Sequence, residues 1–168
     1  MKRVELRPQR VSDASRFVQM LNHPDFIYFP VKPKSIEEEQ DFLSKSSQKR
    51  KAGTEYNFSI LCRRKLVGAV GLKVDQHRQH IGEIGYFVDR SHWGQGIAPA
   101  AVRLIEDFAF LRLGIRRLEI VTLRANKASQ RVAEKCGYRR EGTQRGKLLH
   151  NGEYCDASLY AKVRESGA

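Results

Sequence analysis

A turn that contains two glycines stands before an apolar helical segment in the middle of the chain. It reads Trp93-Gly94-Gln95-Gly96-Ile97-Ala98-Pro99 and follows a strand-like run that ends near Val88. Glycine lets a backbone approach a ligand closely, and the first N–H groups of a helix have no partner within the helix. With the positive end of the helix dipole, such N–H groups can hold a phosphate or a pyrophosphate. The turn therefore predicts a site for a phosphorylated ligand, although a plain glycine turn explains the same residues.

Two common phosphate-binding motifs do not fit this turn. A dinucleotide-binding fold needs Gly-x-Gly-x-x-Gly after the first strand, whereas here the third glycine position is Pro99 and the turn comes late in the chain. The phosphate-binding loop of nucleotide triphosphatases needs Gly-Lys-Ser or Gly-Lys-Thr, which is absent from the turn. Both nucleotide-binding classes are therefore disfavoured.

The cysteines and histidines form no pattern typical of a disulfide framework or a metal site. Cys62, Cys136 and Cys155 are widely spaced and include no CxxC pair. His77 and His80 lie in a charged stretch where no cysteine or carboxylate completes a metal-like set, so a solvated loop is favoured. We expect free thiols in a reducing compartment and no bound metal.

The length and charge of the chain limit the classes of protein it can be. Its 168 residues suit one domain, 1–168, with a substantial core. The charged start has no apolar run after it, and about 20 consecutive apolar residues occur nowhere, so we expect no secretory signal, no membrane span and a cytoplasmic location. With 31 Lys and Arg against 19 Asp and Glu, the net charge is +12. This charge is compatible with nucleic acid, an acidic surface or a phosphorylated cofactor.

Hydrophobic periodicity predicts a mixed α/β sheet with the element order β-α-α-β-β-β-α-β-α-β-β. The strands are expected at 4–6, 56–62, 66–73, 81–88, 118–123, 138–149 and 153–163, and the helices at 12–21, 35–49, 97–113 and 126–136. Ser12-Asp13 and Ser35 predict helix caps, the second within a capping box with Glu38. Asn151-Gly152 predicts a type I′ hairpin turn.

A second segment, Asn126-Lys127-Ala128-Ser129, opens a short helix that is followed by Gly137-Tyr138. Together with the glycine turn it resembles the Gcn5-related N-acetyltransferase (GNAT) superfamily. In that superfamily an Arg/Gln-x-x-Gly-x-Gly/Ala turn binds the pyrophosphate of coenzyme A, and an Asn-x-x-Ser/Ala helix lies along the pantetheine arm. The resemblance extends over nearly the whole chain, and Glu83-Ile84-Gly85-Tyr86-Phe87 is similar to the RimJ/RimL-like branch, which acetylates ribosomal-protein N-termini. It implies the GNAT fold, with about seven strands and about four helices.

The resemblance implies acetyl-CoA as the cosubstrate and a set of residues that bind it. By position these are Phe87, Val88, Asp89, Trp93, Gly94, Gln95, Gly96, Ile97, Ala98, Asn126, Ser129 and Arg131. The first three belong to a strand whose backbone grips the acetyl and pantetheine groups in this family. Trp93 stands where the motif usually has Arg or Gln, so a side-chain contact with the phosphates from that position is in doubt, whereas backbone contacts from the following residues do not depend on it.

Glu83 and Ser129 are the catalytic candidates that the resemblance implies. Glu83 would act as a general base through water, because an amine must lose a proton before it attacks. Ser129 would donate toward the leaving thiolate, since the usual tyrosine seven residues after the motif Asn is Ala133 here. A structural role for Glu83 and a packing or pantetheine-binding role for Ser129 stay open. The stretch Lys147-Leu148-Leu149-His150 offers no alternative carboxylate, and a surface role is favoured for His150.

Three functions are compatible with these residues. The first is an acetyl-CoA-dependent N-acetyltransferase that acts by direct attack on a protein N-terminus, because no cysteine sits in an activating setting. The second transfers acetyl to a small amine such as a polyamine, an aminoglycoside or an amino acid, although a charge of +12 disfavours a polycation. The third is a non-catalytic module that binds RNA or the ribosome, but the basic clusters are scattered over several elements. The sequence leaves the oligomeric state open, a homodimer included.

Overall fold

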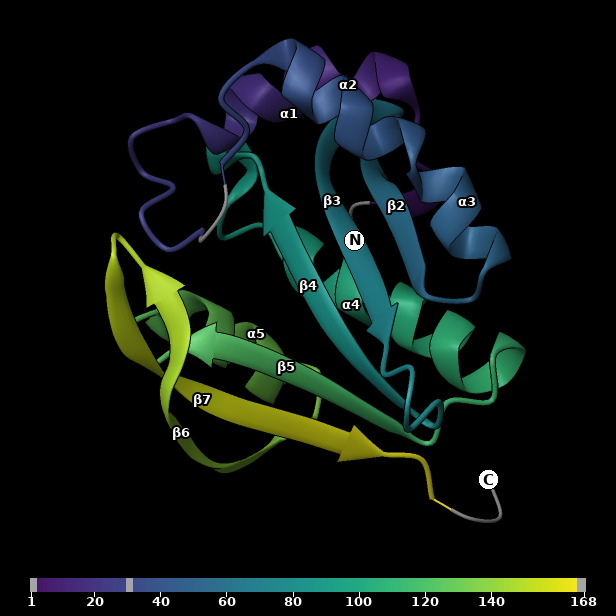
Figure 1. Ribbon diagram of the computed structural model, residues 1–168, viewed down its shortest axis with the longest axis vertical. Helices are drawn as coiled ribbons and strands as arrows, with labels where there is room; N and C mark the ends of the chain where they lie inside the picture. The colour runs from purple at the N-terminus through teal and green to yellow at the C-terminus, as the bar shows by residue number, and fades with distance from the viewer. Residues whose placement is uncertain (1–2, 30–31, 166–168) are drawn as a thin grey trace.

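One mixed sheet forms the centre of the fold. The computed structural model describes residues 3–29 and 32–165, and within them seven strands pair in the order β1-β2-β3-β4-β5-β7-β6 (Figure 1). The strands are β1 (Val4–Pro8), β2 (Glu55–Cys62), β3 (Lys65–Val74), β4 (Ile81–Val88), β5 (Arg117–Leu123), β6 (Arg139–His150) and β7 (Glu153–Val163). β4 and β5 are parallel, and the other neighbouring pairs are antiparallel. The predicted mixed sheet of seven strands and their positions along the chain are confirmed.

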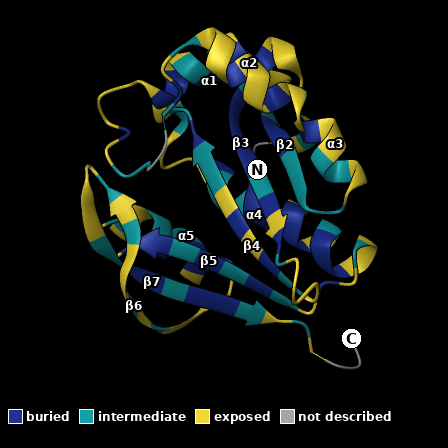
Figure 2. Ribbon diagram, viewed as in Figure 1, coloured by how far each residue is buried: buried dark blue, intermediate teal, exposed yellow. Residues whose placement is uncertain are grey.

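Helices cover both faces of the sheet (Figure 1). They are α1 (Ala14–Leu21), α2 (Ile36–Ser44) and α3 (Ser46–Lys51) on one face, and α4 (Ile97–Asp107) and α5 (Lys127–Lys135) on the other. One core cluster, with Ile84 and Ile105, fills the space between the sheet and α4, and a smaller one, with Phe17 and Leu43, lies under α1 and α2. Buried residues therefore line both sides of the sheet, as Figure 2 shows. None of the helices in the described ranges is long and apolar enough to cross a lipid bilayer.

The helix predicted from Ser35 to about Lys49 is divided in two. Ser35 does cap α2, since its hydroxyl accepts the N–H of Glu38 at 3.1 Å. The helix is interrupted at Lys45, and α3 follows. Just before the break the Ser44 hydroxyl donates to a backbone carbonyl three residues earlier at 2.7 Å, and such bonds compete with those of the helix. The prediction of one continuous helix was therefore wrong.

The cap predicted at Ser12-Asp13 is also absent, because Asp13 serves another purpose. A 3-10 turn, Val11–Asp13, precedes α1, and no side chain caps α1. The buried carboxylate of Asp13 instead accepts from Arg7 at 2.6 and 2.8 Å and from Ser59 at 2.7 Å. Burial raises the pKa of Asp13, but these hydrogen bonds outweigh it and hold the pKa below its usual value. Asp13 thus ties the start of α1 to β1 and β2.

The opening between β4 and β5 is the feature of the sheet that matters most for a ligand. The two strands pair only where Ile81–Glu83 meets Arg117–Glu119, and their carboxyl ends separate beyond that point. The N–H of Asp89, just past β4, bonds to the carbonyl of Val67 at 2.7 Å. Because successive residues of a strand point their backbone groups to opposite sides, those of Tyr86 and Val88 face the opening. The end of β4 therefore presents backbone hydrogen-bonding groups to whatever enters there.

Candidate functional site

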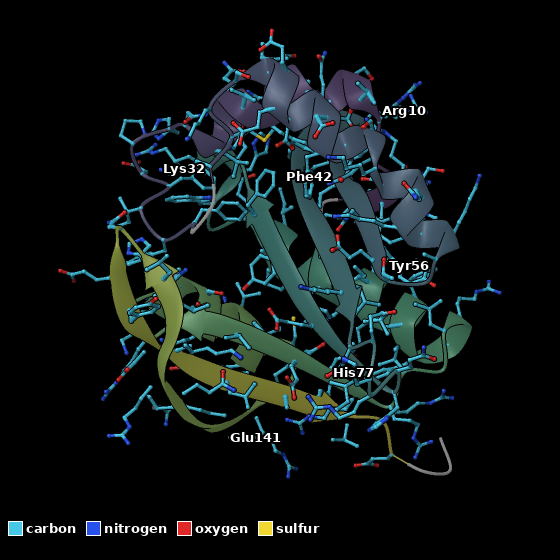
Figure 3. The ribbon with its side chains drawn as sticks, in the orientation of Figure 1. Arg10, Lys32, Phe42, Tyr56, His77 and Glu141 are labelled. Atoms are coloured by element: carbon cyan, nitrogen blue, oxygen red, sulfur yellow. The ribbon has the colours of Figure 1, made fainter. Side chains whose placement is uncertain are left out.

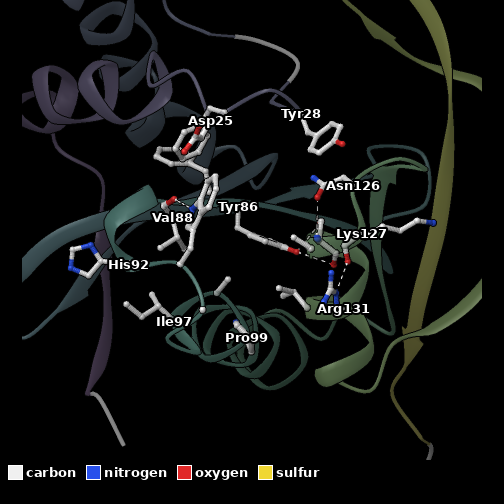
Figure 4. Close-up of a pocket in the computed structure, with 18 of the residues that line it drawn as sticks. Asp25, Tyr28, Tyr86, Val88, His92, Ile97, Pro99, Asn126, Lys127 and Arg131 are labelled. Carbon is white, nitrogen blue, oxygen red and sulfur yellow. Dashed lines mark hydrogen bonds between the residues drawn. The ribbon is translucent and has the colours of Figure 1, made fainter.

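A cavity of about 890 Å³ lies at the carboxyl end of β4 (Figure 4). Its lining comes from the loop 25–29, the end of β4, the turn 92–99 and the residues that begin α5. The glycine turn and the Asn126 segment, which are 30 residues apart in the sequence (126 − 96), therefore meet in one hollow. The aromatic loop 25–29 forms its outer wall.

The glycine turn presents an uncapped helix end to this cavity. Gly94 and Gly96 have φ values of +68° and +75°, a conformation that other residues rarely adopt, and Gly96 is the N-cap of α4. No side chain caps this helix, and a Cβ on either glycine would meet nothing within 4 Å. The N–H groups of Ile97 and Ala98 therefore face open space, and Pro99 removes a donor that the first turn would leave unpaired anyway. This geometry fits an anionic group such as a pyrophosphate.

Asn126 and Ser129 form the opposite wall at the start of α5. The Asn126 side chain caps the helix by accepting the N–H of Ser129 at 3.1 Å. The Ser129 hydroxyl lies 2.8 Å from the hydroxyl of Tyr86 on β4, and the Ser129 carbonyl is 3.3 Å from the same phenol (Figure 4). Burial raises the pKa of Tyr86 to about 12, so this phenol is protonated at neutral pH. A pair of hydroxyl groups thus spans the cavity between β4 and α5.

Sequence reasoning missed Tyr86, although a signal for it was present. In the strand 81–88, Ile84, Tyr86 and Val88 alternate with residues of the other face, and period-two alternation places all three toward α4 and α5. A tyrosine among apolar neighbours on that face needs a partner for its hydroxyl. The partner, Ser129, is 43 residues away, which is why the strand alone could not identify it.

The three residues predicted to grip the ligand by their backbone have different places. Val88 and Phe87 line the cavity. The Phe87 ring points to the other face of the sheet, where it packs edge-on against Phe17 at 5.4 Å. Asp89 lies outside the lining, its N–H is bonded to β3, and its carboxylate pairs with Arg16. The backbone groups that face the opening are accordingly those of Tyr86 and Val88, and the Val88 carbonyl already accepts the indole N–H of Trp93 at 2.7 Å.

Trp93, which departs from the family motif, braces the turn. Its indole N–H donates to the Val88 carbonyl at 2.7 Å, and its ring lies 5.5 Å from that of Phe26. Gln95 donates from its side chain to the Ser91 carbonyl at 3.1 Å, which fixes the same turn from the inside. On α5, Arg131 lines the cavity. The Trp93 side chain therefore holds the strand and the turn together where the motif usually places a polar group.

Glu83 lies outside this cavity, on the opposite face of β4. Its register partners are Lys73 on β3 and Glu119 on β5. The Glu83 side chain reaches solvent, but the neighbouring strands remove part of its hydration, and this desolvation raises the pKa of Glu83. The negative charge of Glu119 adds to the rise, while the positive charges of Lys147 and Lys73 oppose it. Glu119 itself is held by the Arg117 guanidinium at 2.7 Å. Glu83 is thus a carboxylate of raised proton affinity beside the opening between β4 and β5.

The other chemically interesting residues lie away from the site or belong to its walls. His77 is in the loop between β3 and β4, far from the glycine turn, where its N–H bonds to Asp75 at 2.9 Å (Figure 3). His150 joins the β6–β7 hairpin to the aromatic loop, because its Nε2 lies 2.5 Å from the Ile27 carbonyl. A carbonyl can only accept, so Nε2 is the donor. The hairpin turn that holds His150 is the predicted one, with φ of 51° at Asn151 and 80° at Gly152.

Comparison with known proteins identifies this arrangement. The family model described as "Acetyltransferase (GNAT) domain" matches residues 3–139. "Probable N-acetyltransferase YjcK" of Bacillus subtilis (strain 168) is 32% identical over 176 residues, which cover 95% of this chain and 93% of that protein. The "Ribosomal-protein-serine acetyltransferase" of Escherichia coli (strain K12) is 28% identical over 88% of this chain and 79% of that protein. The structure "Mycobacterium smegmatis RimJ in complex with CoA-disulfide" superimposes with a TM-score of 0.87 at 25% identity, covering 95% of this chain and 81% of that one.

These matches agree with the geometry. The family match runs from β1 into the first residue of β6, so it includes the glycine turn, Asn126 and the opening between β4 and β5. The alignment with YjcK covers nearly the full length of both proteins. The chain therefore belongs to the GNAT acetyltransferase family and is an N-acetyltransferase.

Proposed function

We propose that this enzyme transfers acetyl from acetyl-CoA to the amino terminus of a protein by direct attack of the amine. The observation that carries the proposal is the convergence of the uncapped α4 N-terminus, the Asn126 to Ser129 segment and the open backbone of β4 on one cavity. Its volume of about 890 Å³ is within the range of cofactor sites. An alternative acceptor is a small amine, which the net charge of +12 disfavours for polycations.

Different residues of the cavity would bind different parts of the donor, acetyl-CoA. Backbone N–H groups from Gly94 to Ala98 would hold the pyrophosphate, and Arg131 adds a cation beside it. The backbone of Tyr86 and the N–H of Val88 would hold the pantetheine and the thioester in the opening of the sheet. Glu83 then lies on the side from which an amine would approach, and the Tyr86 and Ser129 hydroxyls lie on the side of the departing sulfur.

Direct attack agrees with the state of the cysteines. Cys62 and Cys136 are buried, and burial raises the pKa of the Cys136 thiol, so it is a poor nucleophile. Cys155 is partly exposed, but among the described residues no cation bonds to its sulfur. Within the described chain none of the three is placed to carry the acetyl group. The amine would therefore attack the thioester itself, and the thiolate would leave with a proton from the enzyme.

A ligand and acceptor screen tests this proposal. Acetyl-CoA at about 100 times its dissociation constant should stabilise the protein by about 2.7 kcal/mol, seen as a rise in Tm, whereas RNA should not. Peptides with free N-termini should then gain the mass of one acetyl group, in excess over polyamines, aminoglycosides and free amino acids. Stabilisation by RNA that is sensitive to salt, with no effect of acetyl-CoA, would contradict the proposal. Acetylation of a small amine in preference to every peptide would instead support the alternative function, transfer of acetyl to a small amine.

Gly96→Ala should raise KM for acetyl-CoA about 10-fold with little change in kcat. A Cβ at φ of +75° costs about 1–2 kcal/mol of backbone strain, and it would occupy the open space where a pyrophosphate would lie. Gly114→Ala is the matched control, because Gly114 has φ of +68° and equally open surroundings at the other end of the same helical segment. Both variants should lose thermal stability to a similar degree, measured by Tm. An equal rise of KM in both would mean that the effect is strain alone.

A further inference from the structure

A second cavity, of about 620 Å³, adjoins the first one on the side of the β6–β7 hairpin. The two cavities share Tyr28, Ala125 and Lys127, so the residues before α5 form the partition between them. Its far wall is the end of β6 and the start of β7, with His150 and Asp156. The glycine turn contributes nothing to the lining of this second cavity.

The two cavities lie on either side of the opening between β4 and β5. The parallel pairing of these strands ends at Glu83 and Glu119, and Phe87 and Leu123 each lie four residues further, on the two sides of the opening. Phe87 borders the donor cavity and Leu123 borders the second one. Because the cavities also share three lining residues, a group bound in the second cavity would lie next to the donor cavity.

The polar groups of this cavity are unevenly partnered. Asp156 is already engaged, because its carboxylate accepts the N–H of Gly146 at 3.0 Å. His150 is engaged through its bond to the aromatic loop and lies beside the Tyr28 ring at 6.5 Å. By contrast, the Arg124 guanidinium and the Lys127 ammonium have no hydrogen-bond or ion-pair partner among residues 3–29 and 32–165.

This combination favours an anion. Asp156 is the one carboxylate in the lining and already accepts a backbone N–H, whereas Arg124 and Lys127 are two cations, so the lining has a surplus of positive charge. Arg16 and Arg90 are different, since Arg16 pairs with Asp89 and Arg90 pairs with Asp25. A guanidinium binds a carboxylate through two parallel hydrogen bonds, which makes Arg124 the stronger of the two free groups for that purpose.

We infer that the second cavity receives the residues next to the acceptor's amino group and selects acidic side chains there. The acceptor would be a polypeptide with Asp or Glu among its first residues after the N-terminal one. The carboxylate of a free amino acid has the same chemistry, so it is tested as a separate arm. This inference rests on the proposed function and adds to it a substrate class.

Peptides that differ only in charge test the inference. Three peptides would begin with Ser followed by two Glu, two Ala or two Lys, with identical remaining residues, and free glutamate would be the fourth substrate. We expect kcat/KM to be about 10-fold higher for the Glu peptide than for the Ala peptide, equivalent to about 1.4 kcal/mol, and lowest for the Lys peptide. Arg124→Glu should reverse the order of the charged peptides and leave KM for acetyl-CoA unchanged.

Arg139→Glu is the control for a general change of charge. Arg139 is also exposed, but it begins β6 at the far end of the hairpin, opposite Ala161. This variant should keep the preference of the unmodified enzyme. Equal rates for all three peptides would overturn the inference and leave the proposed function standing. Acetylation of no peptide would overturn both, and a preference for free glutamate over the Glu peptide would overturn the inference in favour of an amino-acid acceptor.

Discussion

Glu83→Gln should lower kcat about 100-fold without changing KM for acetyl-CoA, because it removes the group that accepts the proton of the amine. Glu83 is outside the donor cavity, so the binding of the donor should not depend on it. Turnover is measured by release of the CoA thiol at saturating acetyl-CoA with a peptide acceptor. An unchanged kcat would remove Glu83 from the mechanism.

The pH profile gives a sharper form of this test. An N-terminal amine has a pKa near 8, so kcat/KM should fall below that pH with a slope of about one. Burial and the charge of Glu119 raise the pKa of Glu83, so this carboxylate is protonated, and lost as a base, at a higher pH than an ordinary glutamate. The slope should therefore steepen toward two as the pH falls through the pKa of Glu83. In Glu83→Gln this second step should disappear.

Glu119→Gln is the matched control, since Glu119 stands opposite Glu83 on the parallel strand. Its carboxylate is already paired with the Arg117 guanidinium at 2.7 Å. Removing its charge should lower the pKa of Glu83 and shift the second step of the profile to lower pH, with a small effect on kcat. A larger loss of kcat in Glu119→Gln than in Glu83→Gln would assign the base to β5 instead.

The second large effect concerns the hydroxyl pair of Tyr86 and Ser129. Ser129→Ala should lower kcat about 100-fold and Tyr86→Phe about 10-fold, with smaller changes of KM for acetyl-CoA. When the phenol donates to the Ser129 hydroxyl at 2.8 Å, the serine hydrogen is left to point toward the sulfur. Tyr86 is then a positioning residue that acts through Ser129. The double variant should accordingly be no slower than Ser129→Ala alone.

Three outcomes separate this coupling from simpler explanations. Losses that add in free energy in the double variant would mean that the two hydroxyls act independently. Unchanged thiol release by Ser129→Ala would exclude Ser129 from the mechanism. Tyr138→Phe is the structural control, because Tyr138 is also buried but does not line the cavity. It should keep the kcat of the unmodified enzyme.

Local signals were enough to predict most of the fold. The strands follow from alternation, the Asn151-Gly152 turn needs only two adjacent residues, and Asn126 and Ser35 cap helices within three positions of themselves. The predictions were wrong where a hydrogen-bond partner far away in the sequence determines what a side chain contacts. Asp13 looks like a helix cap in the sequence, but Ser59, which is 46 residues away, and Arg7 draw its carboxylate into the interior.

The same limit applies to the candidate site. The glycine turn could be predicted because a positive φ favours glycine, and two glycines directly before an apolar helical segment are visible in the sequence. Tyr86 could not be assigned a role without the sheet register that brings it to α5. The second cavity could not be predicted from the sequence either. Its walls come from Tyr28, the end of β5 and the hairpin, which come together only in the folded chain.

The hydrogen bond between Ile27 and His150 has a mechanical consequence. These residues are 123 positions apart, and the bond between them links the aromatic loop 25–29 to the β6–β7 hairpin. The loop lines the first cavity and the hairpin lines the second, so while the bond is made a movement of one wall is carried to the other.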